Sequence, residues 1–292
     1  MEQNNLKVAV LNYANGNYLN AQKRLQESIQ FFHPSWTCLF FQDLSDQIPS
    51  QNESPMAFKP YLFEKYINRD FDVLLWLDAV CLAIKPLSRI IEYTLRNGVY
   101  LWTSYTPTGE WTADVTLLNM GIDREKSFKI PELTTCVVSI STGSSKAQEF
   151  IHRWRFYSLD QTSFRGLTKP DVPWTEVIWN NNHCISTHPR VQGHRYDQTV
   201  ASILAHQQGL SRTYLYTFDI QQILHGTSTI SRTSAVPVDA EVIQNRDMKD
   251  GRGLSFSEHL YIGQQNRIIK ILVFLRRKLK VLLFSLGIWK VR

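Results

Sequence analysis

The stretch "DVLLWLDAVCLAIKP", residues 72–86, is an apolar run that is interrupted by one acid, Asp78. A short run that is apolar on both faces predicts a strand inside a sheet that helices cover on each side. The carboxylate of Asp78 then follows the carboxyl end of that strand. An acid at this place is often a turn former or a helix cap, but this edge of an open parallel sheet is also where ligands bind.

Strand and helix patterns alternate around this stretch. In the first half, strands are predicted over residues 7–13, 36–42 and 72–79, and helices over 18–32, 56–68 and 86–98. In the second half, strands are predicted over 134–141 and 212–218, and helices over 145–159 and 194–209. The alternation predicts the α/β class, with a Rossmann-like, mostly parallel central sheet flanked by helices. Residues 160–193 have no clear period, which is typical of a functional loop.

Composition limits the class of protein. With 292 residues and 43% hydrophobic content, the chain can form one large domain or two small ones. The four cysteines are far apart in the sequence, so we expect them to be reduced and the protein to be cytoplasmic. The first ten residues have neither the cationic start nor the apolar stretch of a secretory signal, so export is not expected.

The positive net charge is concentrated near the C-terminus. Eight Lys or Arg residues and no acid lie between Arg267 and Arg292, so removing them from the net charge of +6 leaves about −2 for the rest. A nucleic-acid-binding protein needs a basic face on its folded part. We therefore expect no nucleic-acid partner.

The basic segment has the pattern of an amphipathic helix over residues 259–292. Its leucines and isoleucines recur at helical spacing, and its apolar runs are too short to span a bilayer. The segment 266–292 is predicted to lie on an anionic membrane surface, with a helix packed on the body or a coiled-coil seam as alternatives. The expected organisation is a catalytic domain over 1–220, an irregular extension over 221–258 and this helix.

Four segments carry a resemblance to a known family. They are "LNYANGNYLNAQKRLQESI" near the start, "FKPYLFEKYI", "VLLWLDAVCLAIKPL" and "HRYDQTVASILAHQQG", in this order. Together they resemble nucleotide-sugar glycosyltransferases of the GT-A fold, more narrowly bacterial and viral members that carry "WKPY", "YLDAGC" and "HRHDQS" segments. The resemblance covers roughly residues 6–218 and implies a GT-A-like fold.

The resemblance implies where the donor, a nucleoside-diphosphate sugar, binds. The end of the first strand lines the pocket for the nucleotide base, which here means Asn12, Tyr13 and Asn15. The lysine of the "KP" pair matches Lys59, which could neutralise the diphosphate. The structural alternative is that Lys59 is an ordinary exposed lysine at the start of a helix.

Asp78 matches the first acid of the family's Asp-x-Asp motif, and Val80 occupies the position of the second acid. In metal-dependent members the two carboxylates share the ribose and an Mn²⁺ or Mg²⁺ ion that bridges to the diphosphate. Because a valine side chain has no lone pair, the usual metal site is incomplete and the metal is optional. Asp78 alone can still accept a hydrogen bond from a ribose hydroxyl.

The segment "HRYDQ" supplies the other predicted site residues, His194, Asp197 and Gln198. A His and an Asp at the start of a helix can contact a diphosphate, bind a metal or act as a general base. Asp197 is the first candidate for the base that deprotonates the acceptor hydroxyl, and Asp171 and Glu176 are weaker candidates. The alternative is that Asp197 only caps the helix that follows it.

These observations predict a glycosyltransferase of the hexosyltransferase type that serves cell-surface or other glycan assembly. It would transfer a sugar to a glycan or lipid-linked acceptor while bound peripherally to the inner face of a membrane. Two alternatives stay open. One is a noncatalytic protein of the same fold that binds a nucleotide-sugar or a glycan, and the other is a membrane-tethered interaction protein.

Overall fold

The chain divides into two units. The first contains Met1–Asn15, Ser35–Ala79 and Ser88–Thr217, and the second contains Gly16–Pro34, Val80–Leu87 and Phe218–Arg292. The computed structural model describes residues 6–168, 172–181, 184–214, 220–223 and 241–245.

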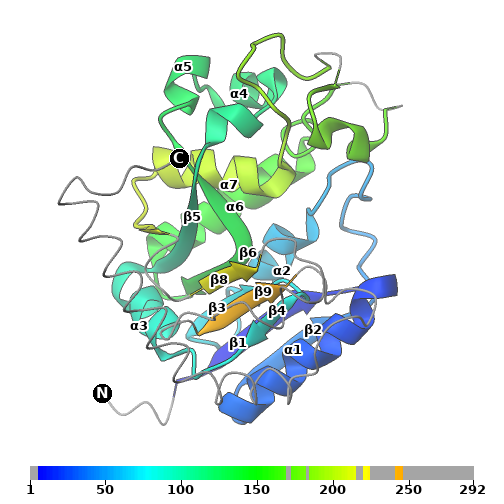
Figure 1. The fold of residues 1–292 in the computed structure, drawn as a ribbon. Coiled ribbons are helices and arrows are strands. Elements are labelled where there is room, and N and C mark those ends of the chain that lie inside the picture. Colours follow the sequence, from blue (N-terminus) through cyan, green and yellow to red (C-terminus); the bar gives the residue numbers. More distant parts are fainter. Residues whose placement is uncertain (1–5, 169–171, 182–183, 215–219, 224–240, 246–292) are drawn as a thin grey trace, which may run out of the picture. The chain divides into compact units, whose positions relative to one another are not determined.

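The first unit is organised around a six-stranded sheet (Figure 1). In spatial order its strands are β2 (Thr37–Phe41), β1 (Val8–Tyr13), β3 (Val73–Leu77), β6 (Pro131–Ser141), β5 (Val99–Pro107) and β7 (Thr213–Tyr214). The pairs β2–β1, β1–β3 and β5–β7 are parallel, and β6 is antiparallel to both of its neighbours. The prediction of an α/β protein with a mostly parallel central sheet is therefore confirmed.

Helices cover both faces of this sheet, which explains why its strands are apolar throughout. Alternate residues of β1 and β3, such as Leu11 and Trp76, belong to the main core together with residues of α2, α6 and α7. The residues between them, such as Val8 and Val73, pack on the opposite face with Ile91 of α3. The bounds of these helices are Phe58–Tyr66 for α2, Ser88–Asn97 for α3, Ser145–Leu159 for α6 and Tyr196–Gln207 for α7.

Several elements of this unit have no counterpart in the prediction. The strand β5 follows Gly98 directly and extends the sheet with the sequence VYLWTSYTP. After it come η3 (Thr108–Trp111), α4 (Asp114–Met120) and α5 (Arg124–Ser127), and η4 (Trp174–Ile178) lies in the segment that was predicted to be irregular. These helices are each less than two and a half turns long, too short to produce a recognisable helical period.

The second unit contains η2 (Gly16–Tyr18), α1 (Leu19–Phe32) and a small sheet with the strand order β4-β9-β8. The strands are β4 (Cys81–Ala83), β8 (Ile220–Ile223) and β9 (Val242–Asn245). Ser28 on α1 accepts a hydrogen bond from the backbone amide of Ala83 at 3.1 Å. The extension predicted to be irregular thus contains β9, which pairs with β4 and β8, and most of β8.

Two further predictions concern other parts of the chain. The four cysteines all lie in described ranges and are free thiols there. The predicted amphipathic helix over 259–292 lies outside the described residues. Within the described ranges, no helix has both the length and the apolar character that crossing a bilayer requires.

Candidate active site

The carboxyl edge of the parallel strands brings together the predicted site residues Lys59, Asp78 and Asp197. Asp78 follows β3 directly, and its backbone amide donates to the carbonyl oxygen of Cys136 on β6 at 2.8 Å. The side-chain amide of Asn12, which is fully buried in β1, donates to the carbonyl oxygen of Leu77 at 2.6 Å. Asn12 therefore joins the ends of two neighbouring strands and helps to fix the position of Asp78.

A cluster of one cation and two acids lies at this edge. The ammonium nitrogen of Lys59, in the first turn of α2, is 3.2 Å from Asp78 Oδ1 and 3.2 Å from Asp197 Oδ2. The same nitrogen donates to the carbonyl oxygen of Thr135 at 3.2 Å, and Thr135 Oγ1 donates to Asp197 Oδ2 at 2.7 Å. Residues from α2, β3, β6 and α7 thus meet in one network, which is called the Lys59 cluster below.

The Lys59 cluster carries more negative than positive charge. Burial alone lowers the pKa of Lys59, but Asp197 and Asp78 outweigh it, so the net pKa is raised and the ammonium group stays charged. Burial raises the pKa of Asp197. The nearby charge of Asp78 raises this pKa further, whereas Lys59 and the hydrogen bond from Thr135 lower it. Two carboxylates share one ammonium group, and the more buried carboxylate therefore holds a proton more strongly than an ordinary aspartate.

Asp78 is the member of the Lys59 cluster that reaches solvent. Its side chain is 28% exposed, against 6% for Lys59 and 6% for Asp197. Its Oδ1 accepts from Trp76 Nε1 at 2.7 Å as well as from Lys59. Among the described residues, nothing donates a hydrogen bond to its Oδ2. Within the described part of the chain, the carboxylate is therefore held through Oδ1 and is partly exposed.

The backbone is strained on both sides of the Lys59 cluster. Met56, three residues before Lys59, has φ of 65°, and Tyr196, directly before Asp197, has φ of 47°. Residues other than glycine rarely adopt this left-handed backbone conformation, which costs roughly 1–2 kcal/mol per residue. Such strain persists where the surrounding structure requires a particular side-chain position, and it concentrates at functional sites.

The remaining residues predicted to bind the base lie next to β1. Tyr13 packs its ring on Phe58 with the centroids 4.9 Å apart, and its hydroxyl accepts from Asn15 Nδ2 at 2.8 Å. Tyr13 is partly exposed and Asn15 is exposed. The three residues therefore differ in accessibility, because Asn12 is buried and bonded within the sheet. Their contact with a nucleotide base stays a prediction.

The side chain of His194 is fully buried, whereas that of Gln198 is partly exposed. Both ring nitrogens of His194 are engaged: Nδ1 accepts from the amide of Ala113 at 3.3 Å, and Nε2 is 3.1 Å from the carbonyl oxygens of Ser163 and Phe164. Burial lowers its pKa to about 4, so the ring is neutral near pH 7. Gln198 is partly buried at the start of α7. Ligand binding by His194 would require these bonds to break, so its predicted role stays a prediction.

A second polar group, not predicted from the sequence, lies beside the start of α7. Glu132 is fully buried on β6, and its Oε2 accepts from Arg195 Nη1 and Thr106 Oγ1, each at 2.8 Å. Burial raises the pKa of Glu132 to about 7, although Arg195 and Thr106 oppose the shift. The sequence signal that could have identified Glu132 is an acid within an apolar strand, since acids are almost never fully buried without a partner.

Replacing Glu132 by Gln is expected to change how stability depends on pH between about 4.5 and about 7. In this range the unfolded chain has released the proton of this carboxyl group, whereas the folded protein still binds it. The contribution of Glu132 to the free energy of unfolding is therefore fully present below pH 4.5 and is lost as the pH rises through about 7. The loss amounts to roughly 3 kcal/mol, which urea denaturation at a series of pH values measures.

The wild-type protein is the necessary reference for this measurement because His194 acts in the opposite direction. Its lowered pKa contributes stability above about pH 6.5 that is lost as the pH falls towards about 4. The difference between the two proteins isolates Glu132. Parallel pH profiles for the wild type and Glu132→Gln would show that this carboxyl group titrates normally in the folded state.

The described residues do not fit a divalent metal site that the protein alone forms. They contain no group of three or more His, Cys, Asp or Glu side chains that could hold a metal ion. Oδ1 of Asp78 is engaged by Lys59 and Trp76, and Val80 supplies no oxygen at the position of the second acid. An ammonium group 3.2 Å from Asp78 also repels a second cation. Mn²⁺ or Mg²⁺ binding at Asp78 therefore has no support from the side chains around it.

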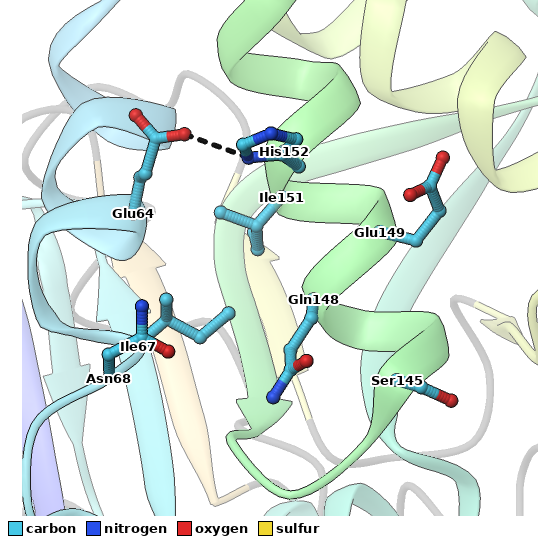
Figure 2. A pocket seen from close by; sticks show the side chains of 8 residues that line it. All are labelled: Glu64, Ile67, Asn68, Ser145, Gln148, Glu149, Ile151 and His152. Carbon is cyan, nitrogen blue, oxygen red and sulfur yellow. Dashed lines mark hydrogen bonds and ion pairs between the residues drawn. The ribbon is translucent and has the colours of Figure 1, made fainter.

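A surface hollow of about 370 Å³ lies elsewhere in the first unit, between α2 and α6 (Figure 2). Glu64 and His152 face each other across it at 3.1 Å, above Ile67 and Ile151. Ser145, in the first turn of α6, also lines the hollow. Helix α6 follows β6, which ends at the amino edge of the parallel strands. The hollow contains none of the predicted site residues.

Comparisons with known proteins give similarity to solved structures only. No protein-family model matches the sequence, and neither does any curated protein. The bifunctional glycosyltransferase WbbM is similar with a TM-score of 0.49 and 10% identity, covering 93% of this chain and 51% of WbbM. The galactosyltransferase LgtC has a TM-score of 0.47 and 12% identity, covering 88% and 95% of the two chains. A glycosyltransferase involved in glycosylation of the major capsid of PBCV-1 has a TM-score of 0.44 and 11% identity, covering 88% and 98%. The likeness is one of overall fold.

Proposed function

We propose that the chain is a glycosyltransferase of the hexosyltransferase type, which transfers a sugar from a nucleoside-diphosphate sugar to a glycan or lipid-linked acceptor. The observation that carries the proposal is the Lys59 cluster. Its three charged members come from three of the four sequence segments that resemble glycosyltransferase motifs, and they meet at the edge of the sheet where ligands of open α/β folds bind.

Within this proposal Asp78 binds the donor. Its exposed carboxylate accepts a hydrogen bond from a ribose hydroxyl, while Lys59 and Trp76 hold its other oxygen. The ends of β1 and β3 would then contain the nucleotide base next to Tyr13 and Asn15. The diphosphate role of Lys59 stays part of the proposal, and in the absence of a donor its ammonium group neutralises the two carboxylates.

Asp197 is the proposed general base. Transfer with inversion requires a group that removes the proton from the acceptor hydroxyl as this oxygen attacks the anomeric carbon. Burial raises the pKa of Asp197, which makes its carboxylate a better proton acceptor than an ordinary aspartate. Lys59 and Thr135 both bind its Oδ2, so Oδ1 is the oxygen that would accept the proton.

The test is release of nucleoside diphosphate from a panel of nucleotide-sugars by the purified full-length protein. We expect turnover with at least one donor, and a rise in melting temperature with its nucleoside diphosphate. Turnover in EDTA is expected to stay within about threefold of turnover with Mn²⁺, because Lys59 already neutralises the carboxylate that a metal would need. Neither turnover nor a thermal shift with any donor would contradict the proposal. A thermal shift without turnover would favour the noncatalytic alternative.

The proposed place of action is the cytoplasmic face of a membrane. Eight basic residues without an acid between Arg267 and Arg292 support attachment to anionic lipid. We expect the full chain, but not a chain that ends at residue 265, to float with vesicles of phosphatidylcholine and phosphatidylserine. Vesicles of phosphatidylcholine alone are the control. Equal flotation of both chains would show that the basic segment is not the anchor.

A further inference from the structure

The side chain of Trp179 is exposed although the structure holds it firmly. Trp179 follows η4 in the long segment before α7 and is 57% exposed. Its ring lies edge-on to the ring of Trp111, at 5.4 Å between centroids and an interplanar angle of 62°. Trp111 itself is 6% exposed. One buried indole ring therefore supports an exposed one, which leaves a face of Trp179 available to a ligand.

Backbone hydrogen bonds fix the position of this tryptophan. The amide of Asn180 donates to the carbonyl oxygen of Gln192 at 2.7 Å, and the amide of His194 donates to that of Val177 at 3.0 Å. A β-carbon at Gly193 would collide with the carbonyl oxygen of Ile178, so glycine permits the two segments to lie this close. The backbone amide of Gln192 in turn donates to the backbone carbonyl oxygen of Glu110 at 2.7 Å. Trp179 is thus exposed on a segment that backbone hydrogen bonds hold in place.

Polar groups with fixed orientation border the Trp111–Trp179 pair. The guanidinium group of Arg195 stacks over the Trp111 ring at 3.9 Å, and its side chain is 36% exposed. The carboxylate of Glu110 accepts from Gln192 Nε2 at 3.1 Å and from Arg190 Nη2 at 3.3 Å. A flat aromatic surface beside a few oriented polar groups is the composition of a small-molecule site.

Both guanidinium groups near this surface are bonded to a carboxyl group. Arg195 is paired with Glu132 at 2.8 Å, and Arg190 is paired with Glu110 at 3.3 Å. A site for a phosphate or an acidic sugar needs cationic groups that are available to the anion, whereas both guanidinium groups here already bind a carboxyl group. The pairs can instead donate and accept hydrogen bonds with hydroxyl groups.

The surface is connected to the Lys59 cluster through the start of α7. Arg195 is two residues before Asp197, the proposed base, and Glu132 is three residues before Thr135, which binds Asp197. The two β6 residues thus bond to Arg195, directly before α7, and to Asp197, in its first turn. A molecule that binds Trp179 and Arg195 would therefore lie next to the chain segment that carries Asp197.

We propose that Trp179 is the stacking surface of the acceptor site, and that the acceptor is a neutral glycan whose hydroxyl groups bind Arg195, Glu110 and Gln192. The inference rests on the proposed function, because it names the acceptor class of the same reaction. A sugar ring presents an apolar C–H face to the indole and hydroxyl groups at its rim. A stable protein interface would need a much larger area with few charges at its centre, which one tryptophan between two ion pairs does not supply.

The contrast with Trp174 supports the assignment. Trp174 lies in the same segment, but its ring packs edge-on against Tyr196 at 5.3 Å and its carbonyl oxygen accepts from the Tyr196 hydroxyl at 2.9 Å. It is partly buried within a small core that also contains Ala113 and Val177. One tryptophan of the segment therefore stabilises the fold, and the other is left on the surface.

The test uses the full chain and saturation-transfer difference NMR. The probes are lactose, maltose, cellobiose, xylobiose and chitobiose, with 3′-sialyllactose as the acidic member. We expect at least one neutral disaccharide to bind, with the strongest transfer to the protons of one ring face. Trp179→Ala is expected to weaken that binding about tenfold, equivalent to about 1.4 kcal/mol, and Trp179→Tyr to retain most of it. Phe156→Ala, which removes a 66% exposed aromatic ring on α6, is the matched control and should bind like the wild type.

Several results would overturn the inference. They are wild-type affinity in Trp179→Ala, an equal loss in Phe156→Ala, binding of sialyllactose alone, and no binding of any probe by the wild type. Nucleoside-diphosphate thermal shifts, measured on the same proteins, separate this inference from the proposed function. If Trp179→Ala loses the glycan but no nucleoside diphosphate stabilises any variant, the glycan site stands and the proposed donor chemistry fails. If nucleotide binding persists without a Trp179 effect, only the acceptor assignment fails.

Discussion

Asp78→Asn is expected to lower kcat for the donor found in the panel by about 100-fold or more. Asparagine keeps the shape of the side chain and an oxygen for Trp76 and Lys59, so the fold should tolerate it. It removes the negative charge that orients the ribose and the ammonium group of Lys59. The melting temperature should therefore change by only about 2–4 °C, while nucleoside-diphosphate release falls. Steady-state kinetics and thermal unfolding on the same sample measure both effects.

The matched control for this variant is Asp72→Asn. Asp72 lies at the other end of the same strand, where its Oδ2 accepts from the amide of Lys7 at 2.8 Å. The substitution changes the charge equally but acts at the amino edge of the sheet, so turnover should stay near the wild-type value. If Asp78→Asn retains full activity, or if Asp72→Asn loses as much, the assignment of the donor site to the carboxyl edge is wrong.

Lys59→Met is expected to destabilise the first unit by about 3–5 kcal/mol. Methionine fills a similar volume, but it leaves two carboxylates facing each other without the ammonium group that lies 3.2 Å from each. Removing one partner of a buried ion pair leaves uncompensated charge in a medium of low polarity, which is more costly than removing the whole pair. Urea denaturation near pH 7 measures the loss, and Lys65→Met, at the exposed end of the same helix, is the control.

A double variant distinguishes charge from packing. Adding Asp197→Asn to Lys59→Met removes the more buried carboxylate, so the double variant should recover a large part of the stability. Lowering the pH towards 4 should likewise help Lys59→Met more than the wild type, because protonation of Asp197, whose pKa burial raises, removes its repulsion of Asp78. If the double variant is as unstable as the sum of the two single variants, the loss comes from packing and the ion network contributes little.

The predictable part of the fold is local. Helix α6 has the bounds that its helical period predicts, and the side chain of Ser144 caps it by accepting from the amide of Ala147. Strands β1, β2 and β3 and helices α1, α2 and α3 also lie within their predicted ranges. In each case the signal is a periodic pattern of apolar residues with a turn or cap beside it, which a single segment contains in full.

Strand β5 shows where this reasoning stops. Its residues Val99–Pro107 begin as an apolar run but continue through Thr103 and Ser104, and its pairing with β6 shifts register between Leu101 and Thr103 and again before Pro107. A strand with such shifts has no regular alternation of apolar and polar residues from which it could be predicted. The strand exists because β6 and β7 satisfy its backbone groups on both sides, which no local pattern records. The same holds for β8 and β9, which pair with each other, and β9 also pairs with β4.

The sequence by itself determined the α/β class, the mostly parallel sheet and the position of Asp78 after a buried strand, because hydrophobic periodicity and turn residues act over a few neighbouring positions. It also has Val80 where the resemblance to glycosyltransferases implies a second acid, which predicts an incomplete pair of metal-binding carboxylates. Only the tertiary structure decided what accompanies Asp78. Lys59 and Asp197 are separated from it by 19 and 119 positions, and they meet because α2 and α7 pack on one face of the sheet. Burial at that meeting point sets the charge of the cluster, and burial is a property of the folded chain alone.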